Sequence, residues 1–432
     1  MQIIKTEVKK DKKYLNNFLN KNYVFDNNKI NIVRKILQDV KKNGDSAVLK
    51  YIKKFDNVVL KTSELKVKTS EIESAYKKVD KNFLYALKLA RLNIYKFHKR
   101  QLRNNWRINS SGIKVESCFI PIEKVGIYVP GGKAAYPSTV LMAGIPAKVA
   151  GVEKIVLCTP CLQDKSLSPY VLVAASEIGI RDIYKIGGAQ AIAVLGFGTK
   201  TIPKVDKIVG PGNEYVTIAK SLVYGIVGID SLAGPSEVVI VADDSANPVY
   251  IASDILAQAE HSEYAMAILI TNSEKLVKLV QIEIKQQIKS LNRNRIIEKS
   301  LNSRGVIIIV KNLSEAVDIV NVKAPEHLEV MVSDYNKILP KIKNSGAVFI
   351  GNYSPSALGD YIAGPSHILP TFSSARFSSA LGVDDFVKRV SFISSTQKNI
   401  KKIAKEVIAF ANIEGFDAHA KSVAKRINDS EK

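Results

Sequence analysis

The scarce histidines mark the first candidates for chemistry, because only five occur in 432 residues. Gln258 and His261 are three residues apart and would share one face of a helix. An amide oxygen and an imidazole nitrogen together can bind a metal ion such as zinc. Glutamine is an uncommon ligand, however, and on spacing alone a capping or core histidine explains this pair better.

Glu326 and His327 place a carboxylate next to an imidazole, an arrangement suited to proton transfer. They follow an Ala-Pro dipeptide, and proline is favoured at the first position of a helix. We therefore predict that both residues lie at a helix N-terminus. The alternative is that Glu326 caps this helix and that His327 is incidental.

Other polar residues are weaker candidates on the sequence alone. Asp360 lies in a long irregular stretch, 353–367, that is rich in small and polar residues, and such stretches often carry function. Glu414 and His419 lie near the end of the chain in what looks like an exposed helix. His98 lies in a run of basic residues, and we expect it on the surface.

Several familiar motifs are incomplete. The dinucleotide fingerprint GxGxxG does not occur, and segment 127–134, IYVPGGKA, lacks the first glycine and the final Ser or Thr of a phosphate-binding loop. We therefore exclude an ATPase. Cys158 and Cys161 form a CxxC pair without a second pair for zinc, and a redox role is the less favoured interpretation. Three cysteines cannot build a disulfide framework in a chain of this length.

Short apolar runs begin at about residue 124 and predict buried strands. Segments of helical length, such as 169–178, 214–224 and 247–259, lie between most of these runs and predict two parallel α/β layers. The predicted strands are 125–129, 154–159, 182–186, 207–209, 238–241, 267–270, 306–310 and 347–350.

Four glycine-rich turns follow predicted strands, and we expect them on one sheet. Open parallel sheets bind ligands beyond the carboxyl ends of their strands, so these turns are candidate ligand loops. For any single turn, a simple tight turn is the better explanation. The turns contain Gly131-Gly132, Gly187-Gly188, Gly210-Pro211-Gly212 and Gly234-Pro235.

The first hundred residues predict helices. Apolar residues recur at helical spacing from Ile72 to Phe97 and indicate one continuous helix, and a shorter helix over 32–40 ends near Asn43-Gly44. From Val383 onward we predict a polar, helical tail.

The net charge of +22 is concentrated near the N-terminus, since residues 1–107 hold 27 Lys or Arg and 10 Asp or Glu, a net +17. This excess indicates either a nucleic-acid surface or, as we favour, a solvated lysine-rich helical face. The composition, 46% hydrophobic and 24% charged, excludes wholesale disorder. The N-terminus lacks the apolar core of a signal peptide, and no apolar run reaches the roughly 18 residues that span a bilayer. We therefore expect a soluble, cytoplasmic protein.

From about residue 120 to 420 the chain closely resembles histidinol dehydrogenases, the family that finishes histidine biosynthesis. The matching segments, in order, are VGIYVPGGKAAYPSTVLMAGIPAKVAGV (125–152), IGGAQAIAVLGFGT (186–199), VDKIVGPGNEYVTIAK (205–220), IDSLAGPSEVVIVAD (229–243), DILAQAEHS (254–262), APEHLE (324–329), GAVFIGNYSPSALGDYIAGPSHILPT (346–371), ARFSSALGVDDFVKR (375–389) and EGFDAHA (414–420).

The resemblance implies a role for each matching residue. Zinc ligands match Gln258, His261, Asp360 and His419, and the catalytic pair matches Glu326 and His327. Residues lining the nicotinamide cofactor match Tyr128, Gln190 and Asn213. Substrate contacts match Ser236, Glu414 and His327, together with the four metal ligands. The chain departs from the usual family pattern at Ser366 (commonly Asn), at Phe372-Ser373 (commonly Gly-Gly) and at Phe416 (commonly Leu).

The resemblance also implies the reaction and the assembly. L-histidinol would be oxidised to L-histidine through bound L-histidinaldehyde, with two NAD+ and one zinc ion per site. His327 would take the hydroxyl proton, Glu326 would activate the water that attacks the aldehyde, and the zinc would orient the substrate. The family's dimers are intertwined, so a homodimer with shared active sites is expected, with no membrane and no specific nucleic acid as partner.

The implied fold is α/β, with two Rossmann-like parallel-sheet domains of an incomplete dinucleotide-binding type and small helical N- and C-terminal extensions. The expected divisions are an extension over 1–22, a main domain over 23–128 and 238–381, a cofactor-side domain over 129–237, and a dimer-swapped tail over 382–432. Two other classes of function remain as alternatives, a nucleic-acid-binding protein that uses the basic first quarter and a metal hydrolase on an α/β scaffold.

Overall fold

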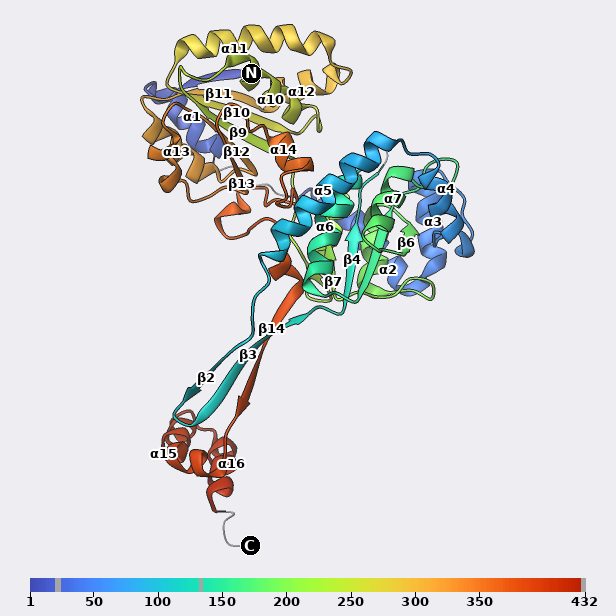
Figure 1. Cartoon of the computed structure of the whole chain (residues 1–432), viewed down its shortest axis with the longest axis vertical. Helices are drawn as coiled ribbons and strands as arrows, with labels where there is room; N and C mark the ends of the chain where they lie inside the picture. The colour runs from blue at the N-terminus through green and yellow to red at the C-terminus, as the bar shows by residue number, and fades with distance from the viewer. Residues whose placement is uncertain (20–24, 132–134, 429–432) are drawn as a thin grey trace.

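The computed structural model describes residues 1–19, 25–131 and 135–428. It contains two parallel sheets, each covered by helices, and a long antiparallel arm that carries the C-terminal helices (Figure 1). The predicted α/β fold with two parallel sheets is thus confirmed. The expected division between residues 22 and 23 and the glycine Gly132 lie outside the described residues.

The first sheet has six strands, and every neighbouring pair is parallel. Its helices cover both faces, since α10, α11 and α12 pack on one face and α1 and α13 on the other. In spatial order the strands are β1 (Gln2–Lys5), β11 (Gly305–Ile309), β10 (Met266–Thr271), β9 (Glu237–Ala242), β12 (His327–Met331) and β13 (Ala347–Ile350). The helices are α1 (Lys9–Leu19), α10 (Pro248–Ala259), α11 (Glu274–Gln287), α12 (Asn294–Arg304), α13 (Leu313–Lys323) and α14 (Ser356–Tyr361).

The second sheet has five parallel strands with alternating helices. Its strands, in spatial order, are β6 (Asp182–Lys185), β5 (Lys154–Thr159), β4 (Lys124–Tyr128), β7 (Lys207–Val209) and β8 (Gly228–Ile229). Its helices are α6 (Pro137–Ala150), α7 (Pro169–Glu177), α8 (Gly188–Phe197) and α9 (Glu214–Val223). All eight strands predicted from residue 124 onward are present, with ends shifted by no more than one residue.

The N-terminal helices pack on the helices of the second sheet, with α2 against α8 and α9, α4 against α7, and α5 against α6. They are α2 (Asn27–Asn43), α3 (Asp45–Asp56), α4 (Thr69–Tyr76) and α5 (Lys81–Lys99). The prediction of one helix from Ile72 to Phe97 is wrong, because Asp80 caps a new helix by accepting a hydrogen bond from the Phe83 N–H at 2.8 Å. His98 is fully buried rather than on the surface, since it continues the inward face of Ile94 one turn later.

The grouping of elements differs from the expected division in two places. Gln2–Lys5 is a strand that pairs with β11, so the start of the chain belongs to the first sheet and is not purely helical. Helices α2 to α5 contact the helices of the second sheet, although they were expected with the first. The domain boundaries themselves stay a prediction.

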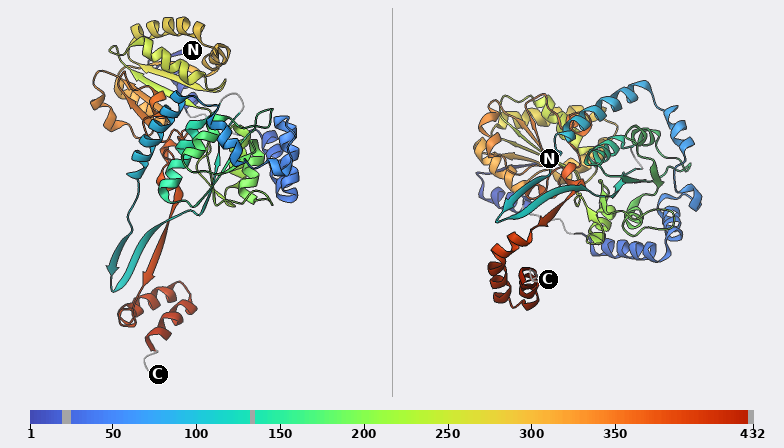
Figure 2. Two further views of the ribbon diagram at one scale, coloured as in Figure 1. Left: turned by 45° about the vertical axis from the view of Figure 1, so that its right-hand side comes forward. Right: turned by 60° about the horizontal axis from the view of Figure 1, so that its bottom comes forward.

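The arm consists of β2 (Trp106–Ser110), β3 (Ile113–Pro121) and β14 (Val387–Ser394), paired antiparallel (Figure 2). Beyond it lie α15 (Gln397–Ile413) and α16 (Asp417–Asn428), which pack on each other. The prediction that the chain is helical from Val383 onward is therefore wrong for β14, because this segment pairs with β3 along its whole length. Large apolar side chains are exposed on the arm and tail, namely Trp106, Ile108, Phe392, Ile393, Phe410 and Ile413.

The segment after β13 connects the two sheets. Ile368, Leu381, Val383 and Phe386 come from this segment, yet they belong to the apolar core of the second sheet. The segment therefore holds the first sheet, where it begins, against the second. Short 3₁₀ turns occur at Thr62–Glu64, Ile288–Ser290, Tyr335–Lys337, Leu339–Lys341, Ser374–Arg376 and Val383–Phe386. Within the described ranges, no helix has the length and apolar character needed to cross a bilayer.

Candidate active site

The predicted catalytic pair lies at the amino edge of the first sheet. His327 is the first residue of β12 and is level with Val238 of β9. The prediction of a helix N-terminus is wrong here, because Ala324 adopts a left-handed conformation (φ 48°) that ends α13 and sends the chain into a strand. Ser236 lies at the same edge, where its carbonyl accepts a hydrogen bond from the Met266 N–H at 2.9 Å.

The Glu326 carboxylate and the His327 imidazole face each other, with 3.6 Å between Oε2 and Nδ1. Both side chains are buried. Glu326 Oε2 accepts a hydrogen bond from the Glu237 N–H at 2.9 Å, and His327 Nδ1 lies 3.3 Å from the Glu237 carbonyl oxygen. Glu237 itself forms a buried ion pair with Lys323. The first residue of β9 thus positions both members of the pair.

Burial and mutual charge shift the titration of this pair. Burial raises the pKa of Glu326 to about 7, against the opposing attraction of His327. Burial disfavours the charged form of His327, but Glu326 and Asp360 outweigh it and raise the pKa of His327 to about 9. A carboxylate whose pKa lies near neutrality can gain and lose a proton readily at physiological pH.

Two of the four predicted metal ligands, Asp360 and His261, interact with His327, and Gln258 comes three residues before His261. Gln258 is in the last turn of α10, His261 follows that helix, and Asp360 is in α14. Asp360 Oδ1 is 3.7 Å from His327 Nε2. Burial opposes the charge of Asp360, but His327 holds its pKa below the usual value, while burial lowers the pKa of His261. Among the described residues, the buried Nε2 of Gln258 has no hydrogen-bond partner.

These three side chains are candidate ligands of a metal ion. In the part of the chain that the structure describes, no group of three or more His, Cys, Asp or Glu side chains is placed to hold a metal ion. Gln258, His261 and Asp360 offer oxygen and nitrogen donors without a thiolate, which is a donor set that zinc accepts. The residues fit zinc on condition that a further ligand joins them.

The two predicted site residues of the tail, Glu414 and His419, lie in the C-terminal helices and not beside the residues described above. Glu414 ends α15 and His419 is in the first turn of α16, and both are exposed. Figure 1 shows these helices at the far end of the arm, away from both sheets. The Phe416 ring lies beside the His419 ring, with 5.2 Å between centroids. One chain therefore does not bring His419 to Gln258, His261 and Asp360.

The predicted cofactor residues lie at the carboxyl edge of the second sheet. The Tyr128 hydroxyl, at the end of β4, accepts a hydrogen bond from the Gly188 N–H at 3.1 Å. Gln190 is buried in the first turn of α8, and its Oε1 has no partner within the described residues. Asn213 caps α9 by accepting a hydrogen bond from the Val216 N–H. The turns at 131, 187–188 and 210–212 lie at this edge, whereas Gly234-Pro235 lies in the connection to the first sheet.

A third histidine at the site was missed in the sequence. His367 Nδ1 lies 2.9 Å from the Asp360 carbonyl oxygen, and Nε2 lies 3.3 Å from Thr139 Oγ1 on α6. Its burial lowers its pKa. Ser366, one of the departures from the family pattern, also reaches α6, since its hydroxyl donates to the Met142 carbonyl at 3.4 Å. His367 is the last residue of the irregular stretch 353–367, where no helical or strand pattern indicates which side chains meet.

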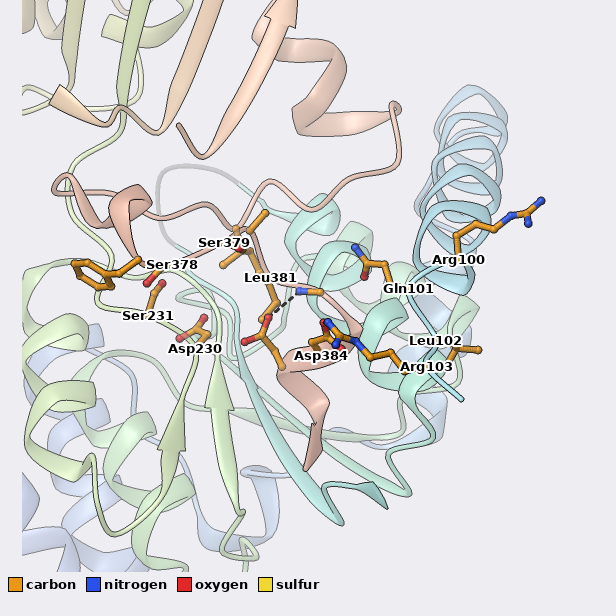
Figure 3. A pocket seen from close by; sticks show the side chains of 15 residues that line it. Arg100, Gln101, Leu102, Arg103, Asp230, Ser231, Ser378, Ser379, Leu381 and Asp384 are labelled. Carbon is orange, nitrogen blue, oxygen red and sulfur yellow. Dashed lines mark hydrogen bonds and ion pairs between the residues drawn. The ribbon is translucent and has the colours of Figure 1, made fainter. Parts of the chain in front are cut away.

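Two cavities adjoin these residues. One of about 650 Å³ is lined by His327, Asp360, His367 and Phe349, and is large enough for a small-molecule substrate. The other, of about 780 Å³, lies at the base of the arm, where Arg103 forms an ion pair with Asp384 (Figure 3). None of the predicted site residues lines the cavity of about 780 Å³. The two cavities share the lining residues Gln101, Ser379, Ala380 and Leu381.

Two buried carboxyl groups, those of Glu329 and Asp254, lie close to the candidate site. Glu329 on β12 and Asp254 on α10 interact through their side chains, and Glu329 Oε1 accepts a hydrogen bond from the Ser356 N–H at 2.9 Å, the first residue of α14. Burial raises the pKa of both carboxyl groups. A shared proton would satisfy them, because two carboxylates offer only acceptors. The pair connects the three elements that carry Gln258, His327 and Asp360.

Comparison with known proteins gives a consistent result. The family model described as histidinol dehydrogenase matches residues 20–427. Histidinol dehydrogenase 2 of Trichormus variabilis is 50% identical, and histidinol dehydrogenase of Clostridium acetobutylicum is 49% identical, each over 92% of both chains. The crystal structure of histidinol dehydrogenase from Elizabethkingia anophelis has a TM-score of 0.94 at 37% identity, and the alignment covers 100% of this chain and 99% of that one.

The carboxyl pair predicts a pH dependence of stability. Because the pKa of Glu329 is raised in the folded state, its protonated form stabilises the fold at low pH, and this stabilisation is lost as the pH rises through the folded pKa. Glu329→Gln, which carries no charge, should lose less stability than the wild type between roughly pH 5 and pH 9. Thermal unfolding midpoints of the metal-depleted proteins measure the difference. The matched control is Glu73→Gln, at an exposed position of α4, and equal pH slopes for Glu329→Gln and wild type would contradict the shared proton.

Proposed function

The chain belongs to the histidinol dehydrogenase family of histidine biosynthesis, and on that premise we propose that it oxidises L-histidinol to L-histidine in two NAD+-dependent steps at a zinc-containing site shared between two subunits. The observation that carries the proposal is the buried Glu326–His327 pair, whose His327 lines the cavity of about 650 Å³ together with Asp360. This arrangement offers a proton acceptor and a candidate metal ligand to one small molecule.

The first oxidation removes a hydride from the carbinol carbon and a proton from its hydroxyl group. The hydride reduces one NAD+, and His327 takes the proton, which gives bound histidinaldehyde. His327 must be neutral to act as this base, whereas Glu326 and Asp360 favour its charged form. Coordination of Asp360 by a cation would withdraw negative charge from His327 and so favour the neutral form.

The second oxidation needs water, because an aldehyde carbonyl carbon must gain an oxygen before it can lose another hydride. Glu326 is suited to accept a proton from that water, since burial brings its pKa to about 7. The hydrate then loses a hydride to a second NAD+ and a proton to the catalytic pair, which gives the carboxylic acid. Neither Cys158 nor Cys161 is needed as a nucleophile, and burial raises the pKa of both thiols.

Gln258, His261 and Asp360 would hold the zinc, with His419 of a second copy as a further ligand. When bound, the metal ion supplies a charged anchor that orients the nitrogen atoms of the substrate. Manganese or cobalt would be accepted by the same oxygen and nitrogen donors. Ser236 and Glu414 are proposed as further substrate contacts.

Tyr128, Gln190 and Asn213 are proposed to line the nicotinamide cofactor. The unpartnered Gln190 Oε1 supports this, since a buried acceptor of this kind calls for a donor that a ligand can bring. Gly188 beside it adopts φ +67°, and a Cβ there would lie 2.9 Å from Gln190 Oε1. A side chain at position 188 would therefore displace the Gln190 amide.

The homodimer is proposed because one chain leaves its site incomplete. The exposed apolar side chains of α15 and of the arm need a partner surface, and Phe410 and Ile413 are 70% and 84% exposed. A two-fold symmetric exchange of the arms would deliver Glu414 and His419 of each chain to the other and would give two identical composite sites.

Metal removal should abolish turnover and leave the fold intact, because the apolar cores of the sheets do not depend on the ion. NADH formation with L-histidinol, measured before and after chelation and after zinc is restored, checks this, with circular dichroism as the control for folding. Full activity in a preparation that elemental analysis shows to be free of metal would contradict it.

The two catalytic residues should differ in the step they affect. His327→Asn should slow both oxidations on the order of 10²–10⁴-fold, the usual contribution of acid–base catalysis. Glu326→Gln should act mainly on the second, where water must be activated. Supplying histidinaldehyde directly separates the steps. Small and equal losses for both variants on both substrates would rule out the assignment.

Complementation should reveal whether His419 acts in trans. His261→Asn and His419→Asn should each be nearly inactive alone. When the two are unfolded together and refolded, a mixed dimer with shared sites has one doubly altered site and one intact site, so activity should return. If each chain builds its own site, every site keeps one lesion. Absence of recovery in mixed dimers verified by mass spectrometry would refute the exchange.

A further inference from the structure

Segment 371–376 is tied to the two segments that lead into the active site. Thr371 Oγ1 accepts a hydrogen bond from the Gly234 N–H at 2.6 Å. The Ser373 hydroxyl donates to the Lys323 carbonyl at 2.7 Å, at the end of α13, and Arg376 donates to the Val322 carbonyl. One side of the segment therefore holds the approach to Ser236, and the other holds the approach to Glu326.

The segment has an unusual backbone at the position of contact. Phe372 and Ser373 adopt φ values of 54° and 59°, in the left-handed region that side chains with a Cβ rarely occupy. Such conformations cost free energy and persist only where surrounding contacts fix them. Glycine, which is usual at these two positions in the family pattern, would adopt them without that cost.

The contact that fixes Phe372 is with Gly234. A Cβ built at Gly234 would lie 2.1 Å from Phe372 Cζ and 2.3 Å from each Cε atom. The tip of the ring therefore occupies the place that any side chain at position 234 would need. Gly234 is two residues before Ser236, which is followed by the start of β9 at Glu237, whose N–H holds Glu326.

We propose that Phe372 is a positioning residue, which presses its ring onto Gly234 and thereby fixes the Gly234-Pro235-Ser236 loop against the substrate. The inference rests on the proposed function for the role of Ser236. The contact offsets only part of the cost of the left-handed backbone at Phe372, so the chain gives up some stability to hold this loop. The ligand concerned is the amino alcohol substrate. The Ser236 side chain would bind the hydroxyl group or the amino group of that substrate.

Two variants and their combination test the contact itself. Gly234→Ala places a methyl group where the ring lies, and should lower the thermal unfolding midpoint of the zinc-loaded full chain. Phe372→Gly removes both the ring and the left-handed strain, and should keep or raise the midpoint. In the double variant, the methyl group has room again, and the loss caused by Gly234→Ala should largely disappear. If Gly234→Ala alone does not fold, the double variant still tests the contact, because removal of the Phe372 ring should then restore folding.

Substrate binding tests the positioning role. Phe372→Gly should raise KM for L-histidinol about tenfold, with kcat changed less than about twofold, because a ground-state contact is loosened. Calorimetric titration of L-histidinol into the zinc-loaded, NAD-free protein should show the same loss of affinity. Phe377→Ala is the matched control, since Phe377 lies in the same loop region and is 84% exposed; it should change neither the midpoint nor KM.

The outcomes separate this inference from the proposed function. Failure of wild-type protein to oxidise L-histidinol would overturn the function, while the coupling between Gly234 and Phe372 would still be read from unfolding midpoints. An additive double variant would overturn the contact. A Phe372→Gly protein that combines an unchanged midpoint with wild-type affinity for L-histidinol would overturn the positioning role.

Discussion

The buried Glu326–His327 pair is the constraint on which the rest of the site depends. Removing a carboxylate and an imidazole from water is costly unless each finds compensating partners. Both find them at the first residue of β9, whose N–H and carbonyl face Glu326 and His327, and His327 also faces Asp360. The parallel register of β9 with β12 sets this geometry, so the central strands of the first sheet determine the positions of the reactive groups.

The site lies between opposite edges of the two sheets. The proposed catalytic pair is at the amino edge of the first sheet, and the proposed cofactor residues are at the carboxyl edge of the second. One chain connection alone would not hold these two edges together. The segment after β13 adds a second link, because it places Asp360 and His367 at the first sheet and packs Ile368 and Phe386 into the core of the second.

The arm gives the chain a surface that it does not cover itself. Its strands and the two terminal helices carry exposed apolar side chains, while α16, which contains His419, lies far from both sheets (Figure 1). The exposed apolar side chains and the position of His419 have the same physical explanation. The proposed exchange of arms between two copies of the chain would cover the apolar surface and would complete the proposed ligand set.

The sequence alone determined much of this molecule. Continuous apolar runs fixed the eight predicted strands, because buried parallel strands need no polar face, and the spacing of family motifs named the candidate residues. Local patterns failed where long-range contacts decided the outcome. The Ala-Pro dipeptide before Glu326 predicted the start of a helix, but His327 begins β12, because this segment pairs with β9 and β13. His98 lies among lysines but is buried by its place on the inner face of α5. Only the tertiary structure decided which edge of which sheet carries the candidate site, and that His419 lies apart from it. Both facts depend on the pairing order of strands that are distant in the chain.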